Sequence, residues 1–150
     1  MKAVIQRVQH ASVAIEGEKE QSIGQGLLVL LGIEDLDDHK DIEWLAKKII
    51  NMRIFNDLNE VMNLSLKDIN GELLLVSQFT LQASTKKGNR PSYIKAATPS
   101  IAIPIYEAFK KQINGMIDTE IKTGIFGADM KVSLLNDGPV TIIIDSKNKI

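Results

Sequence analysis

The sequence predicts a single α/β domain in which two main helices pack on β-sheets, giving three layers in the order α/β/β. Three observations support this prediction. Strand-like segments outnumber helical ones, two segments carry apolar residues at helical spacing, and no linker, repeat or low-complexity segment divides the chain. A length of 150 residues with 44% apolar content is enough for one hydrophobic core. We therefore expect residues 1–150 to form one domain.

The first third of the chain is predicted to form strands. Apolar and polar residues alternate over residues 4–9, and Ala11 to Glu16 follows as a second strand. Gly24-Gln25-Gly26 then leads into Leu27 to Ile33, a run without polar alternation that is typical of a strand buried on both faces. The glycine segment lacks the third glycine and the following helix of a dinucleotide-binding fingerprint, so we interpret it as a turn.

The first helix is indicated by apolar residues at i, i+3, i+4, i+7 and i+8, with Asp37 or Asp38 as its N-cap. These residues are Ile42, Leu45, Ala46, Ile49 and Ile50. The acidic run from Glu34 to Asp41 lacks calcium-loop spacing, and one histidine among carboxylates gives weak support for zinc. We interpret the run as helix capping and solvated side chains.

Asn70-Gly71 predicts a turn, and Glu72 to Thr80 a central strand. Thr98-Pro99 has the cap and first-turn proline of a second helix, although Pro104 suggests that the regular helix begins only there. The expected apolar face of this helix comprises Ile101, Ala102, Ile105, Tyr106, Phe109 and Ile113.

Composition excludes several classes of function. A net charge of −1 leaves no general attraction for nucleic acid, so any RNA contact needs a local patch. The absence of cysteine removes thiol nucleophiles, disulfides and thiolate metal sites. No feature joins His10 or His39 to a candidate serine, so we expect no Ser-His-Asp triad. Without a signal peptide or membrane-length apolar run, we expect a cytoplasmic protein, and nothing in the sequence demands a metal or organic cofactor.

Two short segments stand where an apolar strand meets polar residues: Ser77-Gln78-Phe79-Thr80-Leu81 and Asn136-Asp137-Gly138-Pro139-Val140-Thr141. Strand ends hold backbone groups rigidly while staying reachable, which favours a site; equally, Ser77 and Thr80 could simply satisfy nearby carbonyls. By composition alone, the second segment is more typical of an ordinary hairpin between strands at residues 130–135 and 140–145. A Gly-Pro bond can nevertheless be cis at modest cost.

The segment from Gln82 to Tyr106 has no acidic residue but contains Lys86, Lys87, Arg90 and Lys95. A solvated loop is one interpretation, and a patch that contacts phosphates is the other. Its position directly after the first polar segment favours the phosphate-contacting patch.

Together these segments resemble the D-aminoacyl-tRNA deacylases, and the resemblance runs nearly end to end. The matching blocks are Ile5-Gln6-Arg7-Val8, Ser77 to Leu81, Lys87 to Ser92, Phe126-Gly127-Ala128-Asp129-Met130 and Asn136 to Thr141. Tyr93 stands where phenylalanine is expected in this family, and Lys86 where arginine is common. These departures concern substrate affinity more than activity.

The resemblance implies a deacylase-type fold and a homodimer whose active site lies at the subunit interface. Gly138-Pro139 would be a cis peptide inserted into the partner's pocket, held by Arg7, with Met130 lining that pocket. Without the resemblance, Arg7 would be a surface charge and Met130 a core side chain. Ser77, Gln78, Phe79 and Thr80 would form the catalytic segment, and Lys86, Lys87 and Arg90 would contact tRNA.

The implied reaction is hydrolysis of the ester of D-aminoacyl-tRNA or glycyl-tRNA. Such an ester is already activated, so backbone N–H groups near Phe79 and Thr80 could serve as the oxyanion hole, assisted by the 2′-hydroxyl of the RNA. Thr80 Oγ is the alternative nucleophile or water ligand. The Gly138-Pro139 insert would reject L substrates by exclusion. A non-catalytic tRNA-binding module and a hydrolase of small esters remain the competing hypotheses.

Overall fold

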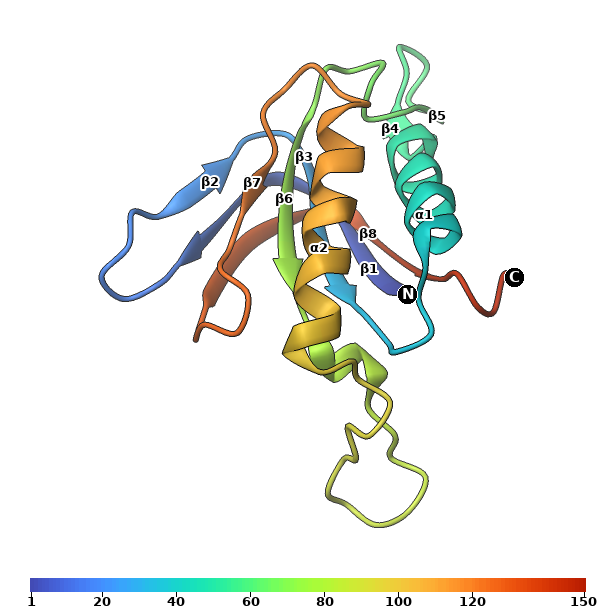
Figure 1. Ribbon diagram of the computed structural model, residues 1–150. Coiled ribbons are helices and arrows are strands. Elements are labelled where there is room, and N and C mark those ends of the chain that lie inside the picture. The colour runs from blue at the N-terminus through green and yellow to red at the C-terminus, as the bar shows by residue number, and fades with distance from the viewer.

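A long antiparallel strand pair, β1 (Lys2–Ala14) and β8 (Lys131–Asp145), frames the computed structural model, which describes residues 1–150 (Figure 1). The other edge of β1 pairs first with β3 (Gly26–Gly32) and then, in the same register, with β2 (Gln21–Ile23). β6 (Glu72–Ser77) lies parallel to β3, and the short β7 (Lys122–Thr123) lies parallel to β6. The result is one mixed six-stranded sheet, with a small pair, β4 (Phe55–Asn56) and β5 (Met62–Leu64), beside it.

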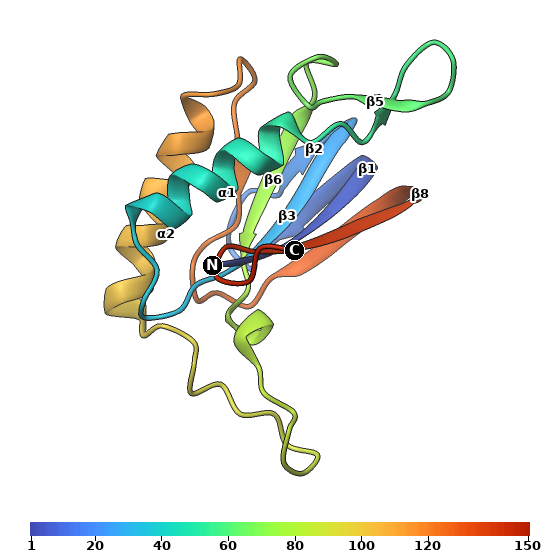
Figure 2. The same cartoon turned by 90° about the vertical axis from the view of Figure 1, so that its right-hand side faces the viewer.

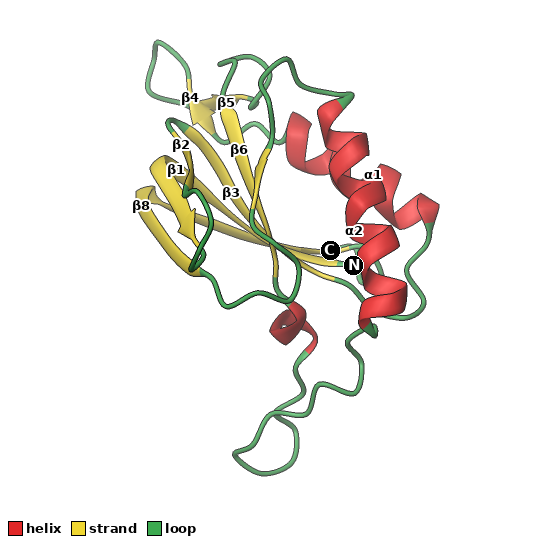
Figure 3. Cartoon of the chain, turned by 60° about the vertical axis from the view of Figure 1, so that its left-hand side comes forward, coloured by secondary structure: helices red, strands yellow, loops and turns green.

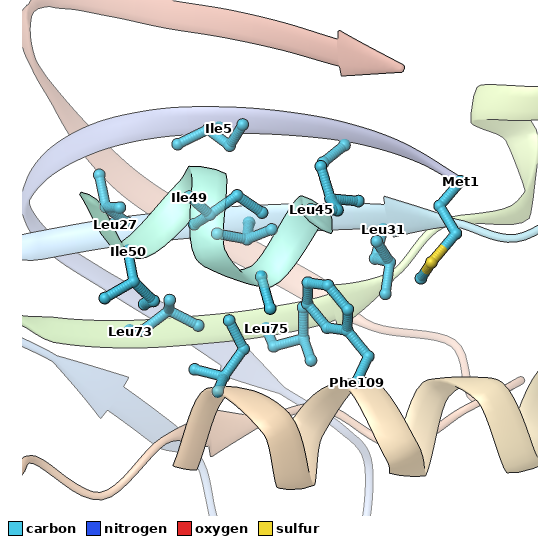
Figure 4. Close-up of a cluster of buried hydrophobic side chains, with 14 of the residues drawn as sticks. Met1, Ile5, Leu27, Leu31, Leu45, Ile49, Ile50, Leu73, Leu75 and Phe109 are labelled. Atoms are coloured by element: carbon cyan, nitrogen blue, oxygen red, sulfur yellow. The ribbon is translucent and has the colours of Figure 1, made fainter. Parts of the chain in front are cut away.

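Both helices, α1 (His39–Asn51) and α2 (Pro99–Asn114), cover the same face of this sheet (Figures 2 and 3). The larger core lies between them and the sheet, where strand residues such as Ile5, Leu27 and Leu75 meet Leu45 and Phe109 (Figure 4). All five side chains are fully buried, and each contributes about 1.5–3 kcal/mol relative to exposure.

The opposite face of the sheet buries a second, smaller cluster. Along β6, Leu73 and Leu75 belong to the helix-facing core, whereas Leu74 and Val76 belong to this second cluster, which also takes in Val132 of β8. The chain is thus a single α/β domain in which two helices cover one face of a mixed sheet, whose other face buries the second cluster. The predicted burial of residues 27–33 on both faces is confirmed, because their side chains alternate between the two clusters.

Two pairs of predicted strands are each a single strand. Residues 4–9 and 11–14 lie in β1, which has register shifts between Gln6 and His10 and ends two residues before the predicted Glu16. Residues 130–135 and 140–145 both pair with β1, so they are the two halves of β8, and the segment between them is a bulge and not a hairpin turn. Local composition cannot distinguish a bulge from a hairpin turn, because both use Asn, Asp and Gly. They are distinguished here only by the fact that both halves of β8 pair with the same strand, β1.

The predicted central strand ends at Ser77, three residues early, and residues Phe79–Gln82 form a short 3-10 helix, η1. The strand ends because the Gln78 N–H makes the last bond to β3, at Leu31 O (2.8 Å), before the chain turns away.

The first helix is confirmed, with all five predicted apolar residues buried and Asp38 in a capping box with Asp41. The second helix begins at Pro99 with Thr98 as its N-cap, as predicted, and the suggestion that the regular helix begins only at Pro104 was wrong. Pro104 lies inside the helix and cannot donate to the carbonyl of Ser100, but the buried residues Ala102 and Tyr106 on either side hold the turn. Ile101 was also misplaced, because its side chain is 39% exposed.

The acidic run before α1 is less solvated than expected. Asp37 is buried and accepts a hydrogen bond from the N-terminal amine of Met1, which also donates to Ser146 Oγ (2.8 Å). Asp41 is buried against Lys147 Nζ, at 2.5 Å. These ion pairs join the start of α1 to both ends of the chain, which sequence spacing could not reveal. No helix is long and apolar enough to cross a membrane.

Candidate active site

A cavity of about 520 Å³ opens at the carboxyl end of β6. One wall is the predicted catalytic segment, represented by Ser77, Gln78 and Phe79. The remaining walls come from Val76 of β6, from the segment that leads into the start of α2, and from the segment that leads from β7 into the start of β8. The residues of the last two are Tyr93, Ala96, Ala97, Pro99, Phe126, Gly127, Ala128, Met130 and Val132. Mostly apolar walls with a few polar groups are typical of a small-molecule site.

The predicted catalytic segment, Ser77 to Thr80, is fixed by bonds to β3 and within η1. Besides its N–H bond to Leu31, Gln78 accepts from the Leu81 N–H (3.2 Å), and its side-chain Nε2 donates to Thr80 Oγ1. η1 can pack closely because position 32 is glycine. A Cβ on Gly32 would lie 2.8 Å from Leu81 Cβ and 3.0 Å from Gln78 O. The close approach therefore sets the position of the whole segment.

The backbone N–H groups of Phe79 and Thr80 donate to no oxygen of the chain. They belong to the first turn of η1, where a helix leaves its N–H groups without internal partners. Phe79 also lines the cavity. Two adjacent free donors at the edge of an apolar cavity can stabilise an oxygen on which negative charge develops.

Aromatic contacts shape the two ends of the cavity. Phe79 and Tyr93 pack edge to face at 5.1 Å between ring centroids, and their side chains remain 55% and 40% exposed. Tyr106 packs similarly on Phe126, and its hydroxyl donates to Leu75 O (3.1 Å). Burial, with the nearby Glu107 charge, raises the pKa of Tyr106, so this hydroxyl stays neutral and holds α2 to β6.

Met130 lines the cavity beside Gly124. A Cβ on Gly124 would come within 2.3 Å of Met130 Sδ, so the glycine leaves room for the thioether. The role of Ala96, Ala97, Pro99 and Val132 in the lining was missed in the sequence, because small apolar residues in loops carry no periodic signal. Phe126 and its neighbours had one usable signal, the block Phe126-Gly127-Ala128.

The Gly138-Pro139 peptide is cis, and both residues are exposed at the tip of the β8 bulge. Arg7, which is almost fully buried, anchors the bulge: its Nε donates to Asp137 O (2.8 Å) and its Nη1 to Ile54 O (2.6 Å). A Cβ on Gly138 would meet Arg7 Nη2 at 3.1 Å, and the φ of Gly138 is +140°.

Within one chain, the bulge and the cavity lie apart. Arg7 pairs with Leu27 at the start of β3, whereas Ser77 pairs with Leu31 near its end. Neither Arg7, Gly138 nor Pro139 lines the cavity. The structure thus brings Ser77 to Phe79 and Met130 together, places Thr80 beside them, and leaves the bulge pointing elsewhere.

The predicted basic patch lies on the loop between η1 and α2, which projects from the body of the chain (Figure 1). Lys86, Lys87 and Arg90 are all exposed, and none forms an ion pair. Paired backbone bonds between Ser84 and Ser92 (2.8 and 2.9 Å) close the base of the loop. These cations lie outside the cavity. No three side chains of His, Asp or Glu are grouped closely enough to hold a metal ion.

Comparison with solved structures defines a deacylase-type α/β fold. The chain matches a structure described as a probable eukaryotic D-amino acid tRNA deacylase with a TM-score of 0.80, over 95% of this chain and 97% of the other. Their 15% identity limits that likeness to the fold. It also matches a structure described as c-Myc DNA Unwinding Element Binding Protein, with a TM-score of 0.91 and 44% identity over 97% of this chain and 98% of the other.

Sequence comparison is more specific. A D-aminoacyl-tRNA deacylase of Flavobacterium psychrophilum is 67% identical over 99% of both chains. The family model for D-Tyr-tRNA(Tyr) deacylase matches residues 4–145. The chain belongs to the D-Tyr-tRNA(Tyr) deacylase family, as its sequence blocks predicted, and is an enzyme of the hydrolase class.

Proposed function

We propose that the chain hydrolyses the ester of D-aminoacyl-tRNA, and of mischarged glycyl-tRNA, releasing the amino acid and free tRNA in the cytoplasm. Family membership supports the deacylation. The observation that carries the mechanism is the pair of free N–H groups, at Phe79 and Thr80, beside the apolar cavity.

In this mechanism the terminal adenosine occupies the cavity and the ester carbonyl oxygen faces the two N–H groups. They stabilise the oxyanion that forms when water attacks, a contribution of about 2.7–4 kcal/mol per donor in other hydrolases. The vicinal 2′-hydroxyl of the ribose positions that water. Thr80 Oγ1 has only the Gln78 amide as a hydrogen-bonding neighbour, and the amide is a donor, not a base. RNA-assisted hydrolysis, without a metal or organic cofactor, is therefore favoured over a threonine nucleophile.

Chiral selection is assigned to the Gly138-Pro139 bulge of a second copy of the chain. The bulge is exposed and anchored by Arg7, and none of its residues lines the cavity of its own chain. A homodimer would let each bulge enter the partner's cavity beside Met130. Its carbonyls would hold the α-amino group and crowd the side on which an L side chain must project.

A non-catalytic nucleic-acid-binding module is the competing function. It is favoured by the unpaired cations Lys86, Lys87 and Arg90, and by likeness to the structure described as a DNA unwinding element binding protein. Such a module would bind tRNA without regard to the aminoacyl group and would leave the ester intact.

The decisive experiment compares hydrolysis of D-tyrosyl-tRNA and L-tyrosyl-tRNA by the purified chain, with and without chelator. Rapid loss of the D ester alone, unaffected by chelator, is expected. Equal rates for the two esters, or no hydrolysis of either, would reject the proposal in favour of the binding module. Free D-tyrosine esters, tested alongside, separate it from a hydrolase of small esters.

Mixing two variants tests the shared site. Ala128→Trp fills the cavity and Pro139→Ala alters the bulge, so neither homodimer should hydrolyse D esters selectively. A mixed dimer has one site with an intact cavity and an intact partner bulge. Mixing should thus restore selective hydrolysis to about one quarter of the unaltered rate, as expected for random pairing of a two-fold dimer. No restoration in samples shown to exchange subunits would place the bulge in its own chain's site.

A further inference from the structure

A second hollow, of about 540 Å³, begins where η1 ends. Its walls are the chain from Gln82 to Lys86, Lys95, Glu34 shortly after β3, and residues near the two ends of the protein, which are Lys2, Asp145 and Lys147. Unlike the cavity, this groove is lined mainly by polar and charged side chains. It is therefore suited to a polar ligand and not to an amino-acid side chain.

Three of the four lysines that line the groove have no acidic partner. Lys147 is neutralised by Asp41, and Glu34 lies 3.9 Å from the N-terminal amine. Lys86 and Lys95 form no ion pair, and Lys2 Nζ donates to a neutral acceptor, Leu81 O (3.2 Å). Asp145, which also lines the groove, forms no ion pair either, so three unpaired lysines face one unpaired carboxylate, on a protein whose net charge is −1.

The groove continues the cavity through two shared segments. Ser77 to Phe79 line the cavity and the same segment continues as Gln82 to Lys86 in the groove; likewise Ala96 lines the cavity and its neighbour Lys95 the groove. Backbone bonds from Ala96 to Tyr93 O (2.9 Å) and from Ala97 to Ile33 O (3.0 Å) fix the chain on either side of Lys95. The cavity and the groove are thus lined by adjacent residues of the same two segments, as a site for one continuous polymer requires.

We propose that this groove binds the phosphodiesters of the single-stranded 3′ end of the RNA, immediately before the aminoacylated nucleotide. The inference rests on the proposed function. Lys95 and Lys86 contact phosphates from the walls, and Lys2 lies at the base. The exposed Phe79–Tyr93 pair, in the wall of the cavity, offers a face on which a base can stack. Cations along a groove combined with aromatic stacking are the usual means of holding single strands.

The test is Lys95→Gln, alone and with Lys2→Gln, assayed on D-aminoacyl-tRNA and on a D-aminoacyl-adenosine that lacks the 5′ phosphates. We expect KM for the tRNA to rise about threefold to tenfold per substitution with kcat largely kept. The slope of log KM against log salt should fall by about 0.7 for each phosphate that the variant no longer neutralises. With the adenosine ester, the KM ratio of variant to unaltered chain should approach one.

Lys67→Gln is the matched control, because Lys67 is exposed, forms no ion pair and precedes the opposite end of β6. An equal rise in KM on both substrates, or an unchanged salt slope, would overturn the proposal that the groove binds phosphodiesters. If the unaltered chain hydrolyses neither ester, the proposed function fails instead. Titration of the variants with tRNA that carries no amino acid then tests the groove separately. A higher Kd for the variants supports phosphodiester binding in the groove, and an unchanged Kd rejects it.

Discussion

The side-chain amide of Asn136 bonds both backbone polar groups of Val140, accepting from its N–H at 2.8 Å and donating to its carbonyl oxygen at 3.4 Å. The two residues flank the exposed Gly138-Pro139 tip, so this contact closes the neck of the β8 bulge. Arg7 holds the same bulge from the other side, through Asp137 O. The tip is thus presented by a fixed loop on an otherwise regular strand.

Replacing Asn136 by alanine should loosen the bulge. The substitution removes two hydrogen bonds to Val140, each of which contributes about 0.5–1.5 kcal/mol. If the bulge selects the substrate, the ratio of D to L hydrolysis should fall about tenfold, equivalent to about 1.4 kcal/mol of discrimination. Asn51→Ala, which removes an exposed helix-surface bond to Lys47 O, is the control. An unchanged ratio of D to L hydrolysis in a folded Asn136→Ala protein would show that the bulge does not discriminate between D and L substrates.

Gly32→Ala should displace the catalytic segment. The added Cβ would meet Leu81 Cβ and Gln78 O at about 3 Å, and overpacking of this kind costs about 1–3 kcal/mol. A shift of about 1 Å in a reacting group can reduce rates about a hundredfold. Expressed as free energies, the fall in kcat should therefore exceed the fall in the free energy of unfolding. Gly115→Ala is a suitable control, since its Cβ would make only ordinary contacts, at 3.6 Å and beyond. Unaltered kcat would mean that η1 tolerates the shift.

Thr80→Ala separates the two candidate mechanisms. The substitution removes Oγ1 but keeps the backbone N–H, so RNA-assisted hydrolysis should retain most of kcat, within about fivefold, well short of the 10²–10³ expected for losing an oxyanion donor. Thr119→Ala, at the opposite end of β6, controls for loss of a threonine hydrogen bond. Complete loss of activity with an unchanged melting temperature would instead identify the Thr80 side chain as the nucleophile or water ligand.

Acid should weaken the junction between α1 and the C-terminal segment. Burial by itself would raise the pKa of Asp41, but hydrogen bonds from Lys147, Ser146 and the Asp38 N–H outweigh it and lower the pKa from 3.8 to about 2. A carboxyl group with a lowered folded-state pKa stabilises the protein above pH 4, and this contribution disappears as the pH falls from about 4 to 2.

The corresponding measurement is urea unfolding of Asp41→Asn at pH 7 and near pH 3. The variant should lose about 1 kcal/mol at pH 7, and the gap to the unaltered chain should narrow in acid. Asp129→Asn, which breaks a pair exposed on both sides with Lys131, should change little at either pH. A gap that stays constant with pH would show that the Asp41 charge does not contribute.

Sequence patterns predicted the structure correctly where the side chains of a single segment determine its conformation. The apolar spacing from Ile42 to Ile50 fixed α1, and the unbroken apolar run after Gly26 fixed β3, because burial of those side chains dominates the local free energy. They failed at Pro104 and Ile101, where packing against the sheet determined how the helix starts and which face it buries.

The sequence by itself determined the α/β class, the polar segment after β6, the acid-free loop with its cations, and the family through blocks spread along the chain. Only the tertiary structure decided that Asn136 to Val140 is a bulge within one strand, because that depends on pairing with β1, far away in sequence. It also decided that Phe79 and Thr80 keep free N–H groups and that the bulge lies apart from the cavity of its own chain. Both are relations between distant segments, set by how the sheet curves and where η1 packs on Gly32.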